Sequence, residues 1–129
     1  MPQVKVFGLA ITLNPIKKEL SEIIHNCFMQ ALQYPPEKRF HRFFSMEKSD
    51  FYFPTDKSNK YLIVEISMFE GRSVEAKKNL IRLLIMSISE KFEISKNDIE
   101  ITIFENPKHN WGVRGVTGDE LNLNYKIDV

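Results

Sequence analysis

The sequence predicts an α+β domain in which two tandem βαβ units form one mixed sheet with two helices on one face. Short runs of branched and aromatic residues alternate with longer stretches of helical periodicity. The two halves of the chain also match each other at a shift of 60 residues without a gap. A chain of 129 residues with 43% hydrophobic residues is long enough for one domain with its own core.

The first unit, residues 2–60, is predicted to contain two strands joined by a helix. The strands are expected at residues 4–9 and 39–45. Asn14 is a predicted N-cap, and Pro15 would occupy the first helical position. Apolar residues then recur every three or four positions for about five turns, until a proline pair ends the helix.

A polar segment at residues 45–60 follows the second predicted strand. It contains serine, aspartate, lysine, asparagine and Pro54, and it is long for a connection inside a compact domain. We interpret it as a linker between the two halves, a lid, or both.

The second unit, residues 61–110, repeats this order. Residues 61–69 form the most apolar predicted strand, and Ser73 is the expected N-cap of a helix that ends near Phe92. A half-buried strand is expected at residues 99–104, where apolar and polar residues alternate.

The C-terminal part is predicted to be a loop at residues 106–118 followed by an extension strand at residues 119–129. Leucine, tyrosine and isoleucine alternate with polar residues along that extension. We expect this strand to lie at an edge of the sheet or to pair with another chain.

Internal duplication of one βαβ unit explains the match between the halves. Any two βαβ units share a similar hydropathy, but the Lys-Lys-x-Leu motif recurs at the same place in both halves. The matching residues are Val4 with Val64, Val6 with Ile66, Lys17 and Lys18 with Lys77 and Lys78, Leu20 with Leu80, and Phe44 with Phe104. Each crossover is expected to be right-handed.

Composition excludes several classes of protein. Eighteen basic and 17 acidic residues give a net charge of +1, which argues against a protein that tracks nucleic-acid phosphates. Cys27 is the only cysteine, so an intrachain disulfide framework is excluded and a reducing compartment is favoured. No apolar run approaches the ~20 residues of a membrane span. A short signal sequence over residues 6–13 is rejected because its basic region is one lysine, so we expect a soluble cytoplasmic protein.

Pro2 opens the first strand, and it becomes a secondary amine if Met1 is removed. An amine held against a hydrophobic sheet can act as a base or acid near neutral pH. The simpler interpretation is a proline tolerated at the first residue of a strand.

Arg72 supplies a group that a carboxylate could bind. It lies between Gly71 and the predicted cap Ser73, at the N-terminus of the second helix, where free backbone N–H groups attract anions. An arginine there can bind a carboxylate in bidentate fashion. We expect the strand opened by Pro2 and the strand before Arg72 to share one sheet, so the two residues can share a pocket. A solvated arginine near a helix cap is the simpler alternative.

The chain resembles the tautomerase superfamily, the group of 4-oxalocrotonate tautomerase and macrophage migration inhibitory factor. It is most similar to fused-repeat members such as malonate semialdehyde decarboxylase and the cis-3-chloroacrylic acid dehalogenases. The resemblance covers nearly the whole chain and depends on Met1-Pro2, Tyr34-Pro35-Pro36-Glu37-Lys38-Arg39-Phe40, Glu70-Gly71-Arg72-Ser73 with Glu75 and Lys77, Glu105-Asn106 and Asn110-Trp111-Gly112.

This resemblance implies a homotrimer with active sites at the strand ends, near subunit boundaries, and no cofactor or metal. It implies that Pro2, freed of Met1, is the catalytic amine, with its pKa lowered by burial and nearby cations. Arg72 would hold the carboxylate or enolate oxygen of a small carboxylic acid. Trp111 and Phe7 are candidate pocket walls, and Arg114 is a candidate second cation; plain packing and solvent exposure are the respective alternatives for Trp111 and Arg114.

Two departures separate this chain from the decarboxylase-like members. Those proteins carry an aspartate where Lys38 stands, and a second arginine in the stretch where Phe69 and Glu70 stand. Neither Lys38 nor Glu70 is an obvious group to activate water. Simple tautomerisation of an enol or dienol acid is therefore favoured over decarboxylation or dehalogenation.

Other functions stay open beside this one. The chain could be a non-catalytic trimeric binding module on the same fold, because fold does not determine function. An RNA-binding sheet is disfavoured, since residues 39–44 lack the glycines of that module. His25 is expected to be a partly exposed helix residue, and Arg39 could reach the site or form a salt bridge on the sheet face. Three scattered histidines show no metal-ligand spacing.

Overall fold

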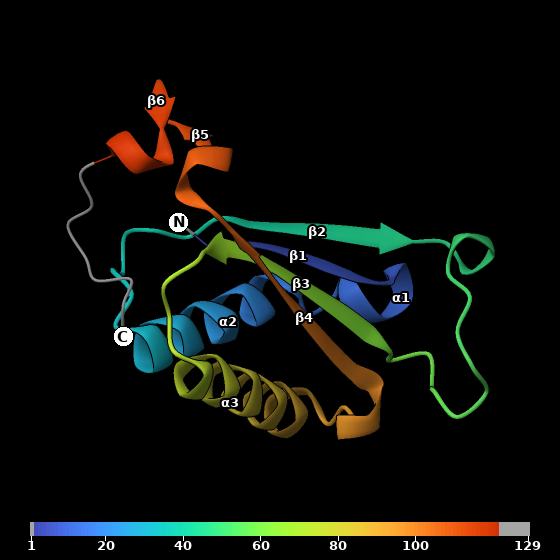
Figure 1. The fold of residues 1–129 in the computed structure, drawn as a ribbon. Coiled ribbons are helices and arrows are strands. Elements are labelled where there is room, and N and C mark those ends of the chain that lie inside the picture. The colour runs from blue at the N-terminus through green and yellow to red at the C-terminus, as the bar shows by residue number, and fades with distance from the viewer. Residues whose placement is uncertain (1, 122–129) are drawn as a thin grey trace.

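The computed structural model describes residues 2–121 (Figure 1). It contains a four-stranded mixed sheet with two long helices packed against one face. The strand order is β2-β1-β3-β4, and the strands are β1 Gln3–Leu9, β2 His41–Met46, β3 Leu62–Phe69 and β4 Ile99–Asn106. The predicted α+β fold with tandem βαβ units is confirmed.

The two βαβ units meet through an antiparallel pair of strands. β1 runs parallel to β2, and β3 runs parallel to β4, as expected when a helix connects the strands of each pair. β1 and β3 are antiparallel neighbours, with Gln3 opposite Ser67 and Gly8 opposite Leu62. The start of β1 and the end of β3 therefore lie at the same edge of the sheet, where "edge" means a border formed by strand ends and not an outermost strand.

The first long helix, α2, spans Lys17–Leu32 and begins later than Asn14 and Pro15 predicted. A one-turn helix, α1 (Ala10–Leu13), precedes it. The backbone N–H of Asn14 donates to the carbonyl of Ala10, so this residue closes α1 instead of capping α2. Burial of Leu13 in the core explains why the chain makes this extra turn.

The second long helix, α3, spans Val74–Phe92 as predicted. The Ser73 side chain accepts a hydrogen bond from the Ala76 N–H at 3.1 Å, which confirms it as the N-cap. Both long helices end at a left-handed residue, Gln33 (φ 52°) and Glu93 (φ 54°). These two residues are separated by the same 60 positions as the sequence match. Duplication itself stays a prediction.

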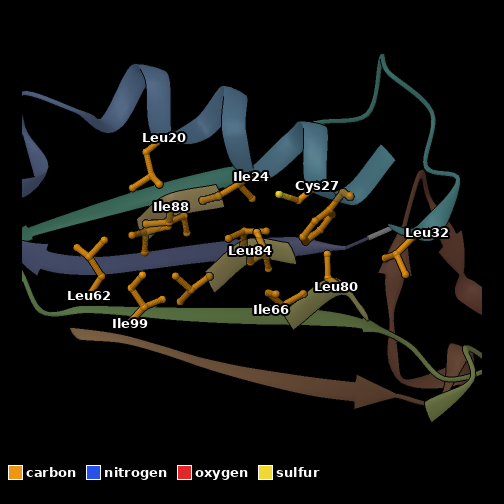
Figure 2. Close-up of a cluster of buried hydrophobic side chains, with 14 of the residues drawn as sticks. Leu20, Ile24, Cys27, Leu32, Leu62, Ile66, Leu80, Leu84, Ile88 and Ile99 are labelled. Carbon is orange, nitrogen blue, oxygen red and sulfur yellow. The ribbon is translucent and has the colours of Figure 1, made fainter. Parts of the chain in front are cut away.

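The hydrophobic core fills the layer between the sheet and the two helices (Figure 2). Each fully buried leucine or isoleucine contributes about 1.5–3 kcal/mol relative to an exposed one. The fully buried aliphatic residues of this layer include Leu20, Ile24 and Leu32 from α2, Leu80, Leu84 and Ile88 from α3, and Leu62 and Ile66 from β3. No helix within residues 2–121 is long and apolar enough to cross a membrane.

Residues 45–60 link the two units at the edge where β1 and β2 end (Figure 1). Phe51 and Phe53 pack against Tyr61, with ring centroids 5.7 and 5.3 Å from its ring. The buried Asp98 accepts a hydrogen bond from the Ser58 N–H at 2.9 Å. This edge is opposite the one at which Pro2 begins β1. The linker interpretation holds, whereas the segment cannot act as a lid over Pro2 of its own chain.

The predicted loop at residues 106–118 is more ordered than expected. It contains a 3₁₀ turn at Lys108–Asn110 and a hairpin of β5 (Gly112–Val113) and β6 (Val116–Thr117). A second 3₁₀ turn, Gly118–Glu120, occupies the first positions of the predicted extension strand at 119–129. That expectation is therefore wrong at its start, and residues 122–129 lie outside the described residues.

Candidate active site

Pro2 and Arg72 lie at the same edge of the sheet. Continuing the β1–β3 register beyond Gln3 and Ser67 by one residue places Pro2 opposite Met68. Arg72 follows β3 by three residues, and its Nη1 lies 3.9 Å from the Met68 sulfur. The antiparallel pairing explains this proximity, because it brings the end of β3, and not its start, to the opening of β1.

Arg72 is held by its local backbone at the entrance of α3. Gly71 has φ 128°, a value that favours glycine, and it turns the chain after β3. Ser73 then caps the 19-residue helix α3, so Arg72 directly precedes a helix N-terminus. The Arg72 residue is only 4% exposed, and Pro2 is buried as well. A guanidinium and a helix N-terminus at one buried edge can both stabilise a carboxylate.

Arg39 lies on the other side of Pro2. The Val4 N–H donates to the Phe40 carbonyl at 2.9 Å, and Val4 pairs with His41 in the parallel register. Continuing that register by two residues places Arg39 beside Pro2. Arg39 is exposed, and within residues 2–121 it forms no salt bridge, so the sheet-face salt bridge is not observed.

An open hollow of about 430 Å³ lies next to this strand opening. Its lining residues are Gln3, Arg39, Phe40, His41 and Arg42. The Arg42 Nη2 donates to the Gln3 Oε1 at 3.2 Å, which ties β2 to β1 beside the hollow. Sequence reasoning did not single out Gln3 or Arg42. Arg42 and Phe44 lie on the same face of the predicted strand at residues 39–45, because side chains alternate between the two faces of a strand.

Trp111 lies at the same edge because β4, which precedes it, is parallel to β3. Its ring packs edge-to-face on Phe69 at 5.0 Å, and its carbonyl accepts a hydrogen bond from the Gly118 N–H at 2.7 Å. Gly118 is closely packed there, since an added Cβ would lie 2.5 Å from the Lys108 carbonyl oxygen. Trp111 thus fastens the β5–β6 hairpin to the end of β3. The packing alternative is observed, and a role as pocket wall stays a prediction.

Arg114 occupies the turn of the β5–β6 hairpin. It has φ 53° and is followed by Gly115 with φ 78°, the backbone that two-residue hairpin turns adopt. Its residue is exposed. The structure places Arg114 on a projection at the edge that carries Pro2, and its role as a second cation stays a prediction.

Phe7 is the one candidate residue that the fold keeps away from Pro2 within a chain. It lies in β1 on the face opposite the helices, stacked on Phe44 at 4.8 Å. Five residues of extended strand separate it from Pro2, a distance of roughly 17 Å. Phe7 cannot line the pocket of Pro2 in its own chain.

Two polar residues near this edge are more buried than the sequence indicated. His25 is 3% exposed, which corrects the expectation of a partly exposed helix residue. Lys38, in the turn before β2, is 9% exposed. Burial lowers the pKa of the neighbouring His41 to about 4, with smaller contributions from His25 and Arg39. Among residues 2–121, no group of three or more histidine, cysteine or acidic side chains is placed to hold a metal ion.

Comparison with known proteins identifies sequence relatives of this chain. A family model described as "Tautomerase enzyme" matches residues 38–114. A 2-hydroxymuconate tautomerase from Comamonas testosteroni is 37% identical over 57 residues, which are 44% of this chain and 90% of that protein. The matched length is that of one βαβ unit. The probable tautomerase YusQ from Bacillus subtilis (strain 168) is 23% identical over 99 residues, covering 73% of this chain and 78% of that protein.

Solved structures show the same fold at lower identity. Native fused 4-OT superposes with a TM-score of 0.82 at 18% identity, covering 92% of this chain and 98% of that one. The malonate semialdehyde decarboxylase FG41, inhibited by 3-bromopropiolate, has a TM-score of 0.76 at 18% identity, covering 85% and 87% of the two chains. At such identities these structures show a shared fold alone.

Proposed function

This chain belongs to the tautomerase enzyme family, and we propose that it is an isomerase that moves a proton between the oxygen and carbon of an enol or dienol carboxylic acid. The position of Pro2 carries the proposal. It is buried at the opening of β1, flanked in register by Met68 and Arg39, and Arg72 contacts Met68. Removal of Met1 would make Pro2 a secondary amine at this place.

The proposed reaction needs only an amine and an oxyanion or carboxylate holder. Neutral Pro2 takes the hydroxyl proton of the enol, and the oxygen electron pair forms the carbonyl. The electrons of the carbon–carbon double bond then take the proton from the protonated amine, which returns to its neutral form. Burial and the neighbouring cations disfavour the protonated amine, which supports a base that is neutral near pH 7. Arg72 holds the substrate carboxylate in bidentate fashion.

Arg39, Arg114 and Trp111 complete the proposed pocket. All three lie at the edge of Pro2, and two of them add positive charge for an anionic substrate. The named relative from Comamonas testosteroni makes 2-hydroxymuconate a suitable first substrate for assays. Phenylenolpyruvate is a simpler second substrate, because it has one carboxylate.

A homotrimer is the proposed assembly. The sheet face opposite the helices exposes Phe44 (39%), which stacks on Phe7, and Phe104 (47%) on β4; these are apolar side chains that a neighbouring copy would cover. Two fused 4-OT proteins that share this fold are a symmetric and an asymmetric trimer. Assembly would also place Phe7 of one copy near another copy, the arrangement in which it could become a pocket wall. Light scattering of the purified protein would test this, and a monomer would contradict it.

The decisive experiment combines an intact mass with two variants of Pro2. Protein expressed without an N-terminal tag is expected to lack Met1. Pro2→Ala is expected to lower kcat/KM for 2-hydroxymuconate by about a hundredfold or more, which is the contribution typical of a positioned general base. Extending the untagged chain by one residue before Pro2 should remove activity to the same extent, since the nitrogen becomes an amide. Unchanged turnover in either variant would contradict the mechanism.

Malonate semialdehyde decarboxylase is a structural neighbour, so decarboxylation is the second activity to assay. Lys38 stands where the decarboxylase-like members carry an aspartate, and the exposed Glu70 stands in the stretch where they carry a second arginine. We therefore expect tautomerisation without carbon dioxide release. A protein that retains Met1 and turns over neither substrate would instead be a binding module on this fold.

A further inference from the structure

His25 makes a hydrogen bond that the proposed reaction does not explain. Its Nε2 lies 2.8 Å from the carbonyl oxygen of Pro36, in the turn that connects α2 to β2. A carbonyl only accepts, so Nε2 carries a proton and the imidazole donates to the turn. The His25 residue is 3% exposed, so the donor end of this bond is shielded from water.

An aromatic cluster holds His25 in this orientation. Its ring meets the rings of Tyr34 and His41 edge-on, at 6.3 and 6.2 Å. Phe28, one helical turn further along α2, also contacts both of those rings. The Nδ1 of His41 lies 2.7 Å from the hydroxyl of Ser21, which is one turn before His25. α2 therefore contacts this turn at three places: at Tyr34 before it, at Pro36 within it and at His41 after it.

The turn that α2 contacts leads to Arg39, which is beside Pro2 when the β1–β2 register is continued. The Lys38 N–H donates to the Pro35 carbonyl at 3.3 Å, which closes the turn. Arg39 follows, beside Pro2 in the extended register, and Phe40 then accepts from Val4 of β1. The position of this whole segment relative to Pro2 depends on contacts made inside the turn and from α2.

We propose that His25 is a positioning residue: through the Pro36 carbonyl it holds the turn at residues 35–40, so that Arg39 lies beside Pro2 to bind the substrate carboxylate. This inference rests on the proposed function for its catalytic meaning. His25 itself does not touch the reacting atoms. Without its donor, the carbonyl of Pro36 loses its hydrogen bond to α2, and the turn is no longer tied to the helix at this point.

The kinetic signature of this role is a change in KM. A cation that contacts the carboxylate in both the ground state and the transition state contributes uniform binding, whose loss raises KM and leaves kcat unchanged. A variant that only unfolds part of the population does the opposite, since it lowers the apparent kcat and leaves KM as it was.

Three variants separate these cases. His25→Leu removes the donor, and we expect KM for 2-hydroxymuconate to rise about tenfold with kcat within about threefold of wild type. His25→Gln keeps an N–H at a similar reach and should restore most of the wild-type KM. Leu20→Ala leaves a cavity in the same helix away from the turn, and it should destabilise the protein without changing KM. A His25→Leu variant with wild-type KM, or a His25→Gln variant as impaired as His25→Leu, would overturn the proposal.

Amide hydrogen exchange tests the same role without turnover. In His25→Leu the amides of Lys38 and Val4 should exchange faster than in Leu20→Ala, after both are scaled to slowly exchanging amides of α3. Equal scaled rates in the two variants would show that His25 does not hold the turn. If the wild-type protein lacks turnover, the proposed function fails, and exchange still decides whether His25 positions this segment.

Discussion

The two edges of the sheet differ in how their polar groups are arranged. At the edge where β1 ends, acidic side chains accept hydrogen bonds from neighbouring residues: Asp98 accepts from the Ser58 N–H, and Glu100 accepts from the Tyr61 hydroxyl at 2.8 Å. At the edge where β1 begins, Arg39 is beside Pro2 in register, and Arg72 contacts Met68, which is opposite Pro2 in register. The first arrangement stabilises the fold, and the second concentrates positive charge around a potential base. Variants at the two edges should therefore separate stability from activity.

Arg72 at the Pro2 edge should show the largest effect. Arg72→Ala is expected to lower kcat/KM by about a hundredfold, because a bidentate partner of the carboxylate is lost. Arg72→Lys keeps the charge but not the fork geometry and should fall between wild type and Arg72→Ala. Steady-state kinetics with circular dichroism as a folding control measures this. Wild-type kinetics in Arg72→Ala would contradict the assignment of substrate binding to the edge where β1 begins.

Asp98 at the opposite edge should affect stability instead. Asp98→Ala removes the buried carboxylate that accepts from the Ser58 N–H, at a cost of about 1.5–3 kcal/mol in the free energy of unfolding, which is typical of a hydrogen bond to a charged group. Urea denaturation would measure the cost, and kcat/KM of the folded fraction should match wild type. A loss of kcat/KM in the folded protein would mean that the two edges are coupled.

His41 makes stability depend on pH. Burial holds its folded-state pKa at about 4, below the ordinary value of 6.5, so the unfolded chain binds a proton first as the pH falls. Stability is therefore complete above about pH 6.5 and declines between there and pH 4, by about 1–3 kcal/mol. Denaturation at several pH values should show this slope in wild type and a flatter one in His41→Gln. Equal slopes would assign the acid sensitivity to other groups.

Tyr61 should give the smallest effect. Tyr61→Phe removes the hydrogen bond to Glu100 but keeps the ring against Phe51, at a cost of about 0.5–1.5 kcal/mol. Burial and Glu100 raise the Tyr61 pKa to about 12, so the bond persists to high pH and its contribution falls between pH 10 and 12. Thermal melts at pH 8 and pH 11 would measure both. A larger loss at pH 11 in Tyr61→Phe than in wild type would contradict this assignment.

Local patterns in the sequence determined most of the elements. Period-2 and period-3.6 runs located the four long strands and the two long helices, and Ser73 was recognised as a cap because a hydroxyl before a periodic run has one common use. The repeat of 60 residues predicted that both units share one architecture. Pro2 and Arg72 were found because their residue types have distinctive chemistry at a strand opening and a helix entrance.

The tertiary structure decided how the strands are paired and how deeply each residue is buried, which sequence periodicity does not specify. The antiparallel pairing of β1 and β3 joins residues about 60 positions apart, and it brings Met68, with the Arg72 that contacts it, to the opening of β1. The same pairing places the start of β3 at the edge where β1 and β2 end, so residues 45–60 connect the two units at that edge. Burial of His25 and the late start of α2 follow from packing against the turn and from Leu13 in the core. Sequence periodicity assigns a face to each residue, but the direction of neighbouring strands and the depth of burial depend on long-range contacts.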